Sequence, residues 1–357
     1  MNQPSKTGGI QFEPARDSAQ YKVAVVGAGS LKGKDLAEVL NERNFPSSQV
    51  KLLDDDESLG QLEAVGDEVT FIQKLRLEEF RNVDFTFFAS DPQSTLKTWK
   101  AVRETGSAIV DMSYALEDDP DAVVRAPSVE RQLELRLFPE LEPKATVIAH
   151  PAAVVLATLM LKVQKAGAVR HVAATVFEPA SEHGQKGMDE LHNQTISLFS
   201  FQPLPKDIFG TQVAFNLISR YGEQSVPALS SVQSRILKHY RKIVPEAPVP
   251  SLLLLQAPVF HGYAFAIQVE LEQTADVEKI AGVLTGDRVN VTHSPDDSPS
   301  NVSAAGQGDI QVSIVPDESN PRGLWLWAAS DNLRIAATTA VECAETLIAT
   351  RPRGVVQ

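Results

Sequence analysis

A glycine-rich segment near the N-terminus constrains the fold of this chain more than any other feature. Tyr21–Val26 is a short apolar run typical of a buried strand, and it leads directly into Gly27-Ala28-Gly29-Ser30-Leu31-Lys32-Gly33 and a helix. A strand, a glycine turn and a helix together form an anion site, because backbone N–H groups and the helix dipole face a pyrophosphate. In that geometry Gly27 permits the turn, Gly29 lets the backbone approach phosphate, and Gly33 allows the helix to pack on the strand.

The spacing of these glycines is GxGxxxG rather than the simplest dinucleotide pattern, GxGxxG. We predict a dinucleotide site at Gly27, Gly29, Ser30, Leu31 and Gly33. The alternative is a glycine turn that joins the first strand to the first helix without binding any ligand.

An acidic run follows the second predicted strand, Gln49–Asp54. Asp54 lies about 20 residues after the loop, where a carboxylate can bind the adenosine ribose hydroxyls. It opens the run Asp54-Asp55-Asp56-Glu57, whose charges would repel a 2′-phosphate. The sequence therefore favours NAD over NADP. The alternative is a solvated acidic loop that contacts nothing.

The pattern of strands and helices predicts two different architectures along the chain. Strands at Val83–Ala89 and Ala108–Ser113 enclose a helix that Asp91 caps, which is typical of a doubly wound parallel sheet. Longer strands then predict an α+β unit with a mixed sheet and helices on one face; we place them at His171–Phe177, Leu253–Phe260, Tyr263–Leu271, Asp309–Ile314 and Leu324–Ala329. The expected division is a flexible tail over 1–20, a dinucleotide-binding domain over 21–150 completed by a C-terminal helix over 331–350, and a dimerisation domain over 151–330.

Composition excludes several classes of function. The chain has 33 basic and 46 acidic residues, a net charge of −13, and this argues against nucleic-acid binding. Its single cysteine, Cys343, excludes disulfide frameworks and cysteine-built zinc sites. The N-terminus lacks the apolar core of a secretory signal, and the most apolar stretch, Ile148–Leu161, is too short to cross a membrane. We expect a cytoplasmic protein that binds no membrane.

Several segments, in order along residues 21–350, resemble those of aspartate-semialdehyde dehydrogenases. They are Gly27–Gly33, Leu36–Pro46, Asp111–Ser113, Gln185–Leu191, Ala214–Asn216, Pro258–Phe260 and Asp331–Leu333. The resemblance implies a Rossmann domain, a central domain that forms a homodimer, and reductive dephosphorylation of aspartyl phosphate with NADPH through a cysteine thioester. It also implies that Asn332 contacts the nicotinamide.

The residues that carry this chemistry in the family are replaced here. Ala153, in His150-Pro151-Ala152-Ala153, stands at the nucleophile, and a methyl group cannot form an acyl-enzyme. Tyr263 stands at the general base, and a phenol with a pKa near ~10 is a poor base at neutral pH. Glu178 stands at the active-site glutamine and Gln256 at the arginine that pairs with the substrate carboxylate. We call Ala153, Glu178, Gln256 and Tyr263 the four family positions.

The anion-binding residues are changed as well. The resemblance places Glu117 at the phosphate-binding arginine, which reverses the charge, and a carboxylate there would repel phosphate. The resemblance also implies a Glu and a Lys on the substrate helix. Val232 and Arg235 stand at these two positions, so only the positive charge is kept. Glu57 matches the residue that meets the 2′-phosphate of the cofactor.

Histidines and the single thiol offer weaker candidates. His150, Glu178, His183 and His261 could gather near the domain junction, but none shows ligand spacing, and we predict no metal site. His261 could partly replace the lost base, although a half-buried histidine on a strand is the simpler interpretation. Cys343 is predicted to be a small core residue of the last helix.

Three hypotheses follow. The first is a non-catalytic homodimeric member, closest in character to the Usg-type paralogues of the family, that binds NAD or an unidentified protein partner. The second is a repurposed NAD-dependent oxidoreductase that transfers hydride without a covalent intermediate, with Tyr263, His261 or Glu178 handling the proton. The third is an assembly role with an empty cofactor cleft.

Overall fold

The parallel sheet predicted for the first half of the chain is present. The computed structural model describes residues 20–54, 60–65, 68–133, 145–223, 225 and 228–350, so the predicted tail and the acidic residues 55–57 lie outside the described residues. Seven strands pair in the order β5-β2-β1-β6-β7-β9-β8, all parallel. Their bounds are β1 Tyr21–Val26, β2 Ser47–Asp54, β5 Gln73–Lys74, β6 Phe85–Phe88, β7 Ala108–Asp111, β8 Ala122–Arg125 and β9 Ala145–Ile148.

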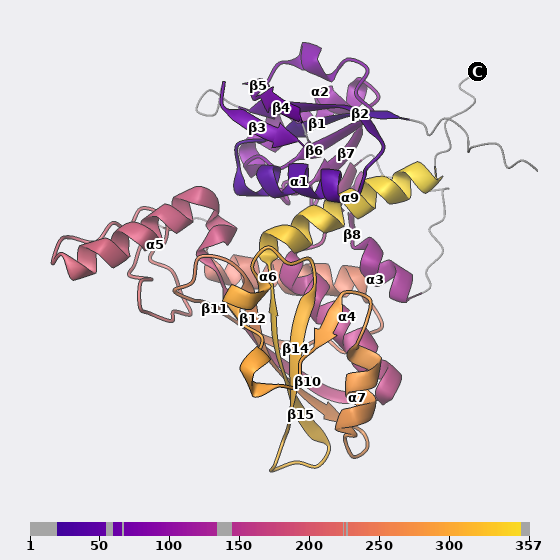
Figure 1. The fold of residues 1–357 in the computed structure, drawn as a ribbon, viewed down its shortest axis with the longest axis vertical. Helices are drawn as coiled ribbons and strands as arrows, with labels where there is room; N and C mark the ends of the chain where they lie inside the picture. The colour runs from indigo at the N-terminus through magenta and orange to yellow at the C-terminus, as the bar shows by residue number, and fades with distance from the viewer. Residues whose placement is uncertain are drawn as a thin grey trace, which may run out of the picture.

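Helices cover this sheet, and two of them start at predicted caps. The Ser30 side chain accepts the Gly33 N–H at the start of α1 (Leu31–Glu42), and Asp91 accepts two N–H groups at the start of α2 (Pro92–Glu104). The C-terminal helix lies along α1 although some 290 residues separate them (Figure 1). The remaining elements of this half are β3 Leu62–Val65, β4 Glu68–Phe71, η2 Leu77–Phe80, α3 Pro127–Gln132 and the C-terminal helix α9 Asn332–Thr350.

The second half contains the predicted mixed sheet with helices on one face. Its strands pair in the order β11-β10-β12-β15-β14-β13, with β10 parallel to β11 and antiparallel to β12. The helices α4, α6 and α7 pack on one face, and exposed side chains such as Trp325 lie on the other. The bounds are α4 Pro151–Ala166, β10 Val169–Glu178, α6 Leu229–Ile243, β11 Ser251–Gln256, β12 Tyr263–Leu271, α7 Val277–Leu284, β13 Val289–Val291, η4 Pro295–Asp297, α8 Asn301–Ala304, β14 Ile310–Pro316 and β15 Gly323–Ser330.

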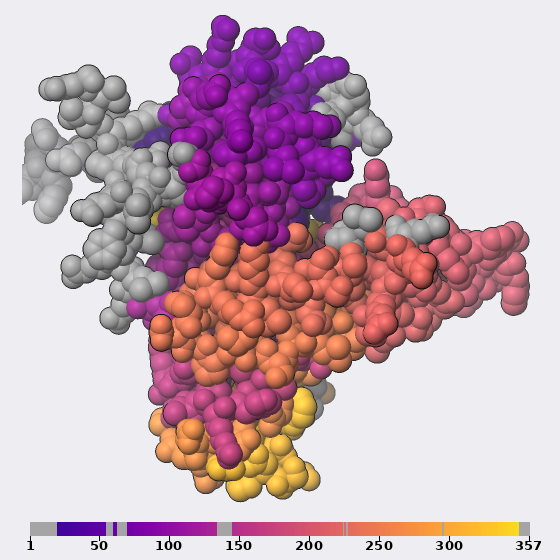
Figure 2. Space-filling model, turned by 180° about the vertical axis from the view of Figure 1, so that it is seen from behind, coloured from indigo at the N-terminus to yellow at the C-terminus, as the bar shows by residue number. Residues whose placement is uncertain are grey.

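A helical arm projects from this second half. It consists of η3 (Ala180–His183), α5 (Gly184–Phe199) and the loop that follows, and both views show it standing away from the two sheets (Figures 1 and 2). Two buried polar side chains hold the loop to α5. Glu190 accepts the N–H groups of Ile208 and Phe209, and Gln194 accepts those of Val213 and Ala214.

Two local predictions are wrong. The predicted strand Leu253–Phe260 ends at Gln256, and the chain turns at Gly262, with φ +81°, before β12 begins. His261 is therefore half-buried in a bend rather than on a strand.

The apolar stretch that begins at Ile148 contains a helix, α4, that the sequence pattern does not predict. Nearly all residues of α4 are buried, so the helix shows no polar stripe in the sequence. Among the described helices, none is long and apolar enough to cross a membrane.

Candidate functional site

The glycine loop is held by contacts within the chain. A Cβ atom on Gly27 would lie 2.4 Å from the Ser90 backbone nitrogen, and one on Gly33 would lie 2.3 Å from the Gly27 carbonyl oxygen. Packing alone therefore requires both glycines. Asp54 lies beside the loop, as its position after β2 predicts, and its Oδ2 accepts the Gly29 N–H at 2.7 Å. The Asp54 carboxylate therefore already accepts the hydrogen bond of one amide of the predicted anion site.

The four family positions are all completely buried. Ala153 lies in the first turn of α4, and Tyr263 begins β12 with its ring 6.1 Å from that of His150. The Tyr263 hydroxyl finds no hydrogen-bond partner among the described residues. Burial, reinforced by the charges of Glu182 and Glu178, raises the pKa of Tyr263 well above its ordinary value. The phenol therefore stays protonated at neutral pH and cannot act as a base.

Gln256 is committed to neighbouring groups. Its amide NH₂ donates to the carbonyl oxygens of Glu178 and Ala257 at 2.9 and 2.8 Å, which turns its oxygen toward the Tyr221 hydroxyl at 2.6 Å. The same hydroxyl lies 2.9 Å from Glu178 Oε1 and 2.8 Å from His183 Nε2. Because both Gln256 donors are used, this side chain cannot bind a substrate carboxylate in the manner of an arginine.

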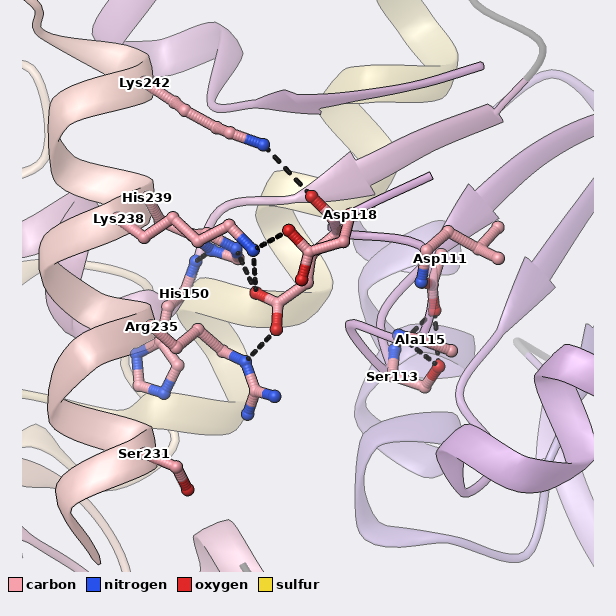
Figure 3. A network of polar contacts seen from close by, with 12 residues as sticks. Asp111, Ser113, Ala115, Asp118, His150, Ser231, Arg235, Lys238, His239 and Lys242 are labelled. Carbon is pink, nitrogen blue, oxygen red and sulfur yellow. Dashed lines mark hydrogen bonds and ion pairs between the residues drawn. The ribbon is translucent and has the colours of Figure 1, made fainter. Parts of the chain in front are cut away.

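Arg235 of α6 pairs with Glu117, the carboxylate that the resemblance aligns with the phosphate-binding arginine. Glu117, in the loop after β7, accepts hydrogen bonds from Arg235 Nε at 3.0 Å and His239 Nε2 at 2.8 Å, and Lys238 Nζ lies 3.7 Å away. The Lys242 ammonium donates to the Glu117 carbonyl oxygen at 3.0 Å. These four residues of α6 lie on one helix face and turn toward the loop (Figure 3). We call this set the Glu117 clasp; it joins the parallel-sheet half to the mixed-sheet half.

Hydrogen bonds fix the proton of His239. The His150 N–H donates to His239 Nδ1 at 2.9 Å, so that nitrogen carries the lone pair and Nε2 carries the proton given to Glu117. Burial lowers the pKa of His239 and lowers that of His150 further. Burial alone would raise the pKa of Glu117, but the hydrogen bonds from His239 and Arg235 and the charge of Arg235 outweigh it and hold the pKa at about 2. The centre of the clasp is therefore a carboxylate that accepts from a guanidinium and a neutral imidazole.

The clasp should make stability depend on pH in the acid range. The pKa of Glu117 falls from its ordinary 4.5 to about 2 on folding, so its contribution is fully present above pH 4.5 and is lost as the pH falls toward 2. We expect the urea midpoint of the wild type to fall more steeply between about pH 5 and about pH 3 than that of Glu117→Gln. Equal slopes for the two proteins would contradict this.

A second cluster lies between the glycine loop and the second half. Lys32 Nζ donates to the Met112 carbonyl oxygen at 3.3 Å and lies 4.6 Å from the centre of the Tyr114 ring. Burial lowers the pKa of Lys32, and the charge of Glu182 partly restores it. Asn332, predicted to contact the nicotinamide, is fully buried; its amide donates to Glu182 Oε1 at 2.9 Å and its oxygen accepts the Gly262 N–H at 3.1 Å.

The predicted metal-ligand candidates do not assemble. Glu178 and His183 meet at 3.4 Å, whereas His150 lies with His239 and 3.9 Å from Glu182, and His261 stands apart. No group of three metal-ligating side chains was found in the part of the chain that the structure describes. Cys343 is buried in α9, and burial raises the pKa of its thiol, as expected for a core residue.

The sequence did not single out several residues of this region: Lys32 as a side chain, Tyr114, Glu182, Tyr221 and His239. Tyr114 follows the carboxyl end of β7, where functional side chains of a parallel α/β sheet gather, and that signal could have found it; Glu182 follows β10 of the mixed sheet, to which the rule does not apply. Tyr221 and His239 come from a loop and a helix interior that carry no such signal.

The chain is similar in sequence and in structure to proteins of one family. Residues 22–135 match the family model described as the semialdehyde dehydrogenase NAD binding domain, and residues 161–335 match the semialdehyde dehydrogenase dimerisation domain. The chain is 28% identical over 340 residues to an aspartate-semialdehyde dehydrogenase of Rickettsia bellii, covering 93% of this chain and 98% of that protein. It is 30% identical over 337 residues to a USG-1 protein homolog of Azotobacter vinelandii, with the same coverage. The solved structure of a probable aspartate-semialdehyde dehydrogenase from Pseudomonas aeruginosa superposes with a TM-score of 0.80 at 26% identity, over 92% of this chain and 99% of that one.

Proposed function

The chain belongs to the semialdehyde dehydrogenase family, and within it we propose a non-catalytic member that keeps the fold, self-association and part of the nucleotide site. The observation that carries this proposal is the Glu117 clasp. The resemblance places Glu117 at the phosphate-binding arginine, and its carboxylate accepts the Arg235 Nε hydrogen bond and lies among the α6 cations that an anionic substrate would need. An external phosphate would have to displace a tethered carboxylate of the same sign.

The covalent step of the family reaction also lacks its groups. A thioester requires a thiol, and Ala153 offers a methyl group at that place. The proton of an attacking thiol would require a base, and the pKa of Tyr263 is raised rather than lowered. Each change opposes the same reaction, which supports loss of the whole activity rather than adjustment of one step.

The test is a search for the acyl-enzyme by intact-protein mass spectrometry. The purified full-length chain is incubated with aspartate semialdehyde and NAD or NADP without phosphate, so that a thioester would accumulate. We expect an unchanged mass. A stoichiometric adduct that requires the dinucleotide would overturn the proposal, and an aspartate-semialdehyde dehydrogenase that has its cysteine serves as the positive control.

For the nucleotide site, we propose that the loop binds the adenosine diphosphate half of NAD. Asp54 lies within hydrogen-bonding distance of Gly29, so its carboxylate borders the place where a ribose meets the phosphates. A 2′-phosphate there would face this charge, so NADP is the disfavoured dinucleotide.

The exposed face of the mixed sheet supports a homodimer. Leu253 and Trp325 are 48% and 43% exposed, and they line a shallow groove of about 410 Å³ across β10, β11, β12 and β15. An apolar face of this kind is typical of a buried interface. We expect Leu253→Asp to shift the wild-type dimer toward monomer in sedimentation velocity. The matched control is Leu96→Asp, which changes a leucine of similar exposure on α2, in the parallel-sheet half. A Leu253→Asp protein that sediments like the wild type would contradict this interface.

A further inference from the structure

The two ends of the nucleotide crevice differ in access. In a doubly wound sheet a dinucleotide lies across the carboxyl ends of the strands, with its adenosine ribose at the acid after the second strand and its pyrophosphate at the first helix. Here those places are the end of β2 and the β1–α1 loop, and the other nucleotide half would extend over β6 and β7.

Within the part of the chain that the structure describes, the adenosine end is only partly covered. Gly29, Ser30, Leu31 and Asp54 are each only partly buried. As in any helix, the N–H groups of the first turn of α1 have no acceptor within the helix. The Ser30 side chain accepts the Gly33 N–H. Leu31 and Lys32 thus present two amides at the end of a twelve-residue helix.

The other end is filled by the chain itself. The Lys32 side chain starts in the first turn of α1 and reaches the carbonyl oxygen of Met112, immediately after β7, so it crosses the end of β6 that lies between them. It rests on the ring of Tyr114, whose hydroxyl is buried and finds no partner in the described part of the chain. Asn332, which would meet the nicotinamide, is buried and bonded to Glu182 and Gly262.

We propose that this site takes a nucleoside diphosphate rather than a whole dinucleotide, with the Lys32 ammonium as the partner of the terminal phosphate. The ribose hydroxyls donate to Asp54, and the phosphates accept from the N–H groups of Leu31 and Lys32 in the first turn of α1, because the amides of the loop itself already have acceptors in the chain. Lys32 exchanges the neutral Met112 carbonyl for an anion, which is a stronger partner. A second nucleotide half would have to displace Lys32 and Tyr114 together. The inference rests on nucleotide binding by the loop, as proposed above.

The test is isothermal titration of the full-length protein with ADP, AMP and NAD. We expect ADP to bind at least about tenfold more tightly than NAD, since NAD contains the same diphosphate but carries the half that the chain excludes. NAD binding tenfold tighter than ADP would overturn the inference and leave the proposed function in place. No heat with any of the three at about 5 mM would overturn the inference together with the nucleotide part of the proposed function, while its non-catalytic part would stand.

A lysine substitution tests the residue assigned to the terminal phosphate. Lys32→Met should weaken ADP about tenfold and change AMP by less than about twofold, because AMP lacks the phosphate that Lys32 meets. The ADP-to-AMP ratio is measured within one variant, so a general loss of stability cancels. Lys34→Met changes an exposed lysine two residues further along α1 and should leave the ratio at the wild-type value. An unchanged ratio in Lys32→Met would contradict the assignment.

Discussion

Replacing Glu117 with alanine is expected to lower the free energy of unfolding by about 3 kcal/mol, since it removes one partner of a largely buried charged cluster. The Glu117 and Arg235 side chains are 13% and 26% exposed, and His239 is fully buried. The substitution leaves a guanidinium and an imidazole N–H without their acceptor, and it also cuts the contact between the two halves.

The matched control is the neighbouring acid. Asp118 pairs with Lys238 at 2.5 Å, but its side chain is 82% exposed, so Asp118→Ala should change stability by less than about 1 kcal/mol. Urea unfolding followed by circular dichroism and by tryptophan fluorescence measures both variants. Equal effects of the two substitutions would show that the clasp adds nothing beyond a surface ion pair.

The second large effect concerns the family reaction itself. Ala153→Cys alone should give no phosphate-dependent turnover, because the new thiol would be buried, the phenol at the predicted base position stays protonated, and Gln256 and Glu117 bind no substrate anion. Restoring together the residues that the resemblance implies, as Ala153→Cys with Glu117→Arg, Glu178→Gln, Gln256→Arg and Tyr263→His, should give turnover at least about 100-fold above the rate measured without protein. The measurement is the initial rate of reduced dinucleotide formation with aspartate semialdehyde and phosphate.

Two results would contradict this account of the lost activity. Turnover by Ala153→Cys alone would mean that the clasp does not close the anion site. A combined variant that folds, as judged by circular dichroism, and still shows no activity would mean that loss of the reaction involves more than these positions.

The fold was largely predictable because its signals are local. The glycine loop, the caps at Ser30 and Asp91 and the alternation of strands each depend on a few neighbouring residues. The helix α4 was missed because complete burial removes the polar stripe that marks a helix in sequence. His261 was placed on a strand because the chain turns at Gly262, which apolar pattern alone does not reveal.

The site was less predictable because its partners are far apart in the chain. The identity of residue 117 showed that a charge had been reversed, but its partner His239 lies 122 residues away on a helix face. The sequence places Lys32 within the glycine-rich segment. It does not predict the hydrogen bond from Lys32 to the Met112 carbonyl oxygen, because that contact depends on the order β1-β6-β7 in the sheet. The resemblance implies that Asn332 contacts the nicotinamide, yet only the packing shows that Glu182 and Gly262 use its amide.

The most direct test of the central claim is the steady-state assay of the wild-type chain with aspartate semialdehyde, phosphate and either NAD or NADP. The Glu117 clasp, Ala153 and the protonated Tyr263 predict no reduction of dinucleotide above the rate without protein. Turnover that saturates with both the semialdehyde and phosphate, and that persists through repeated purification, would contradict a non-catalytic role.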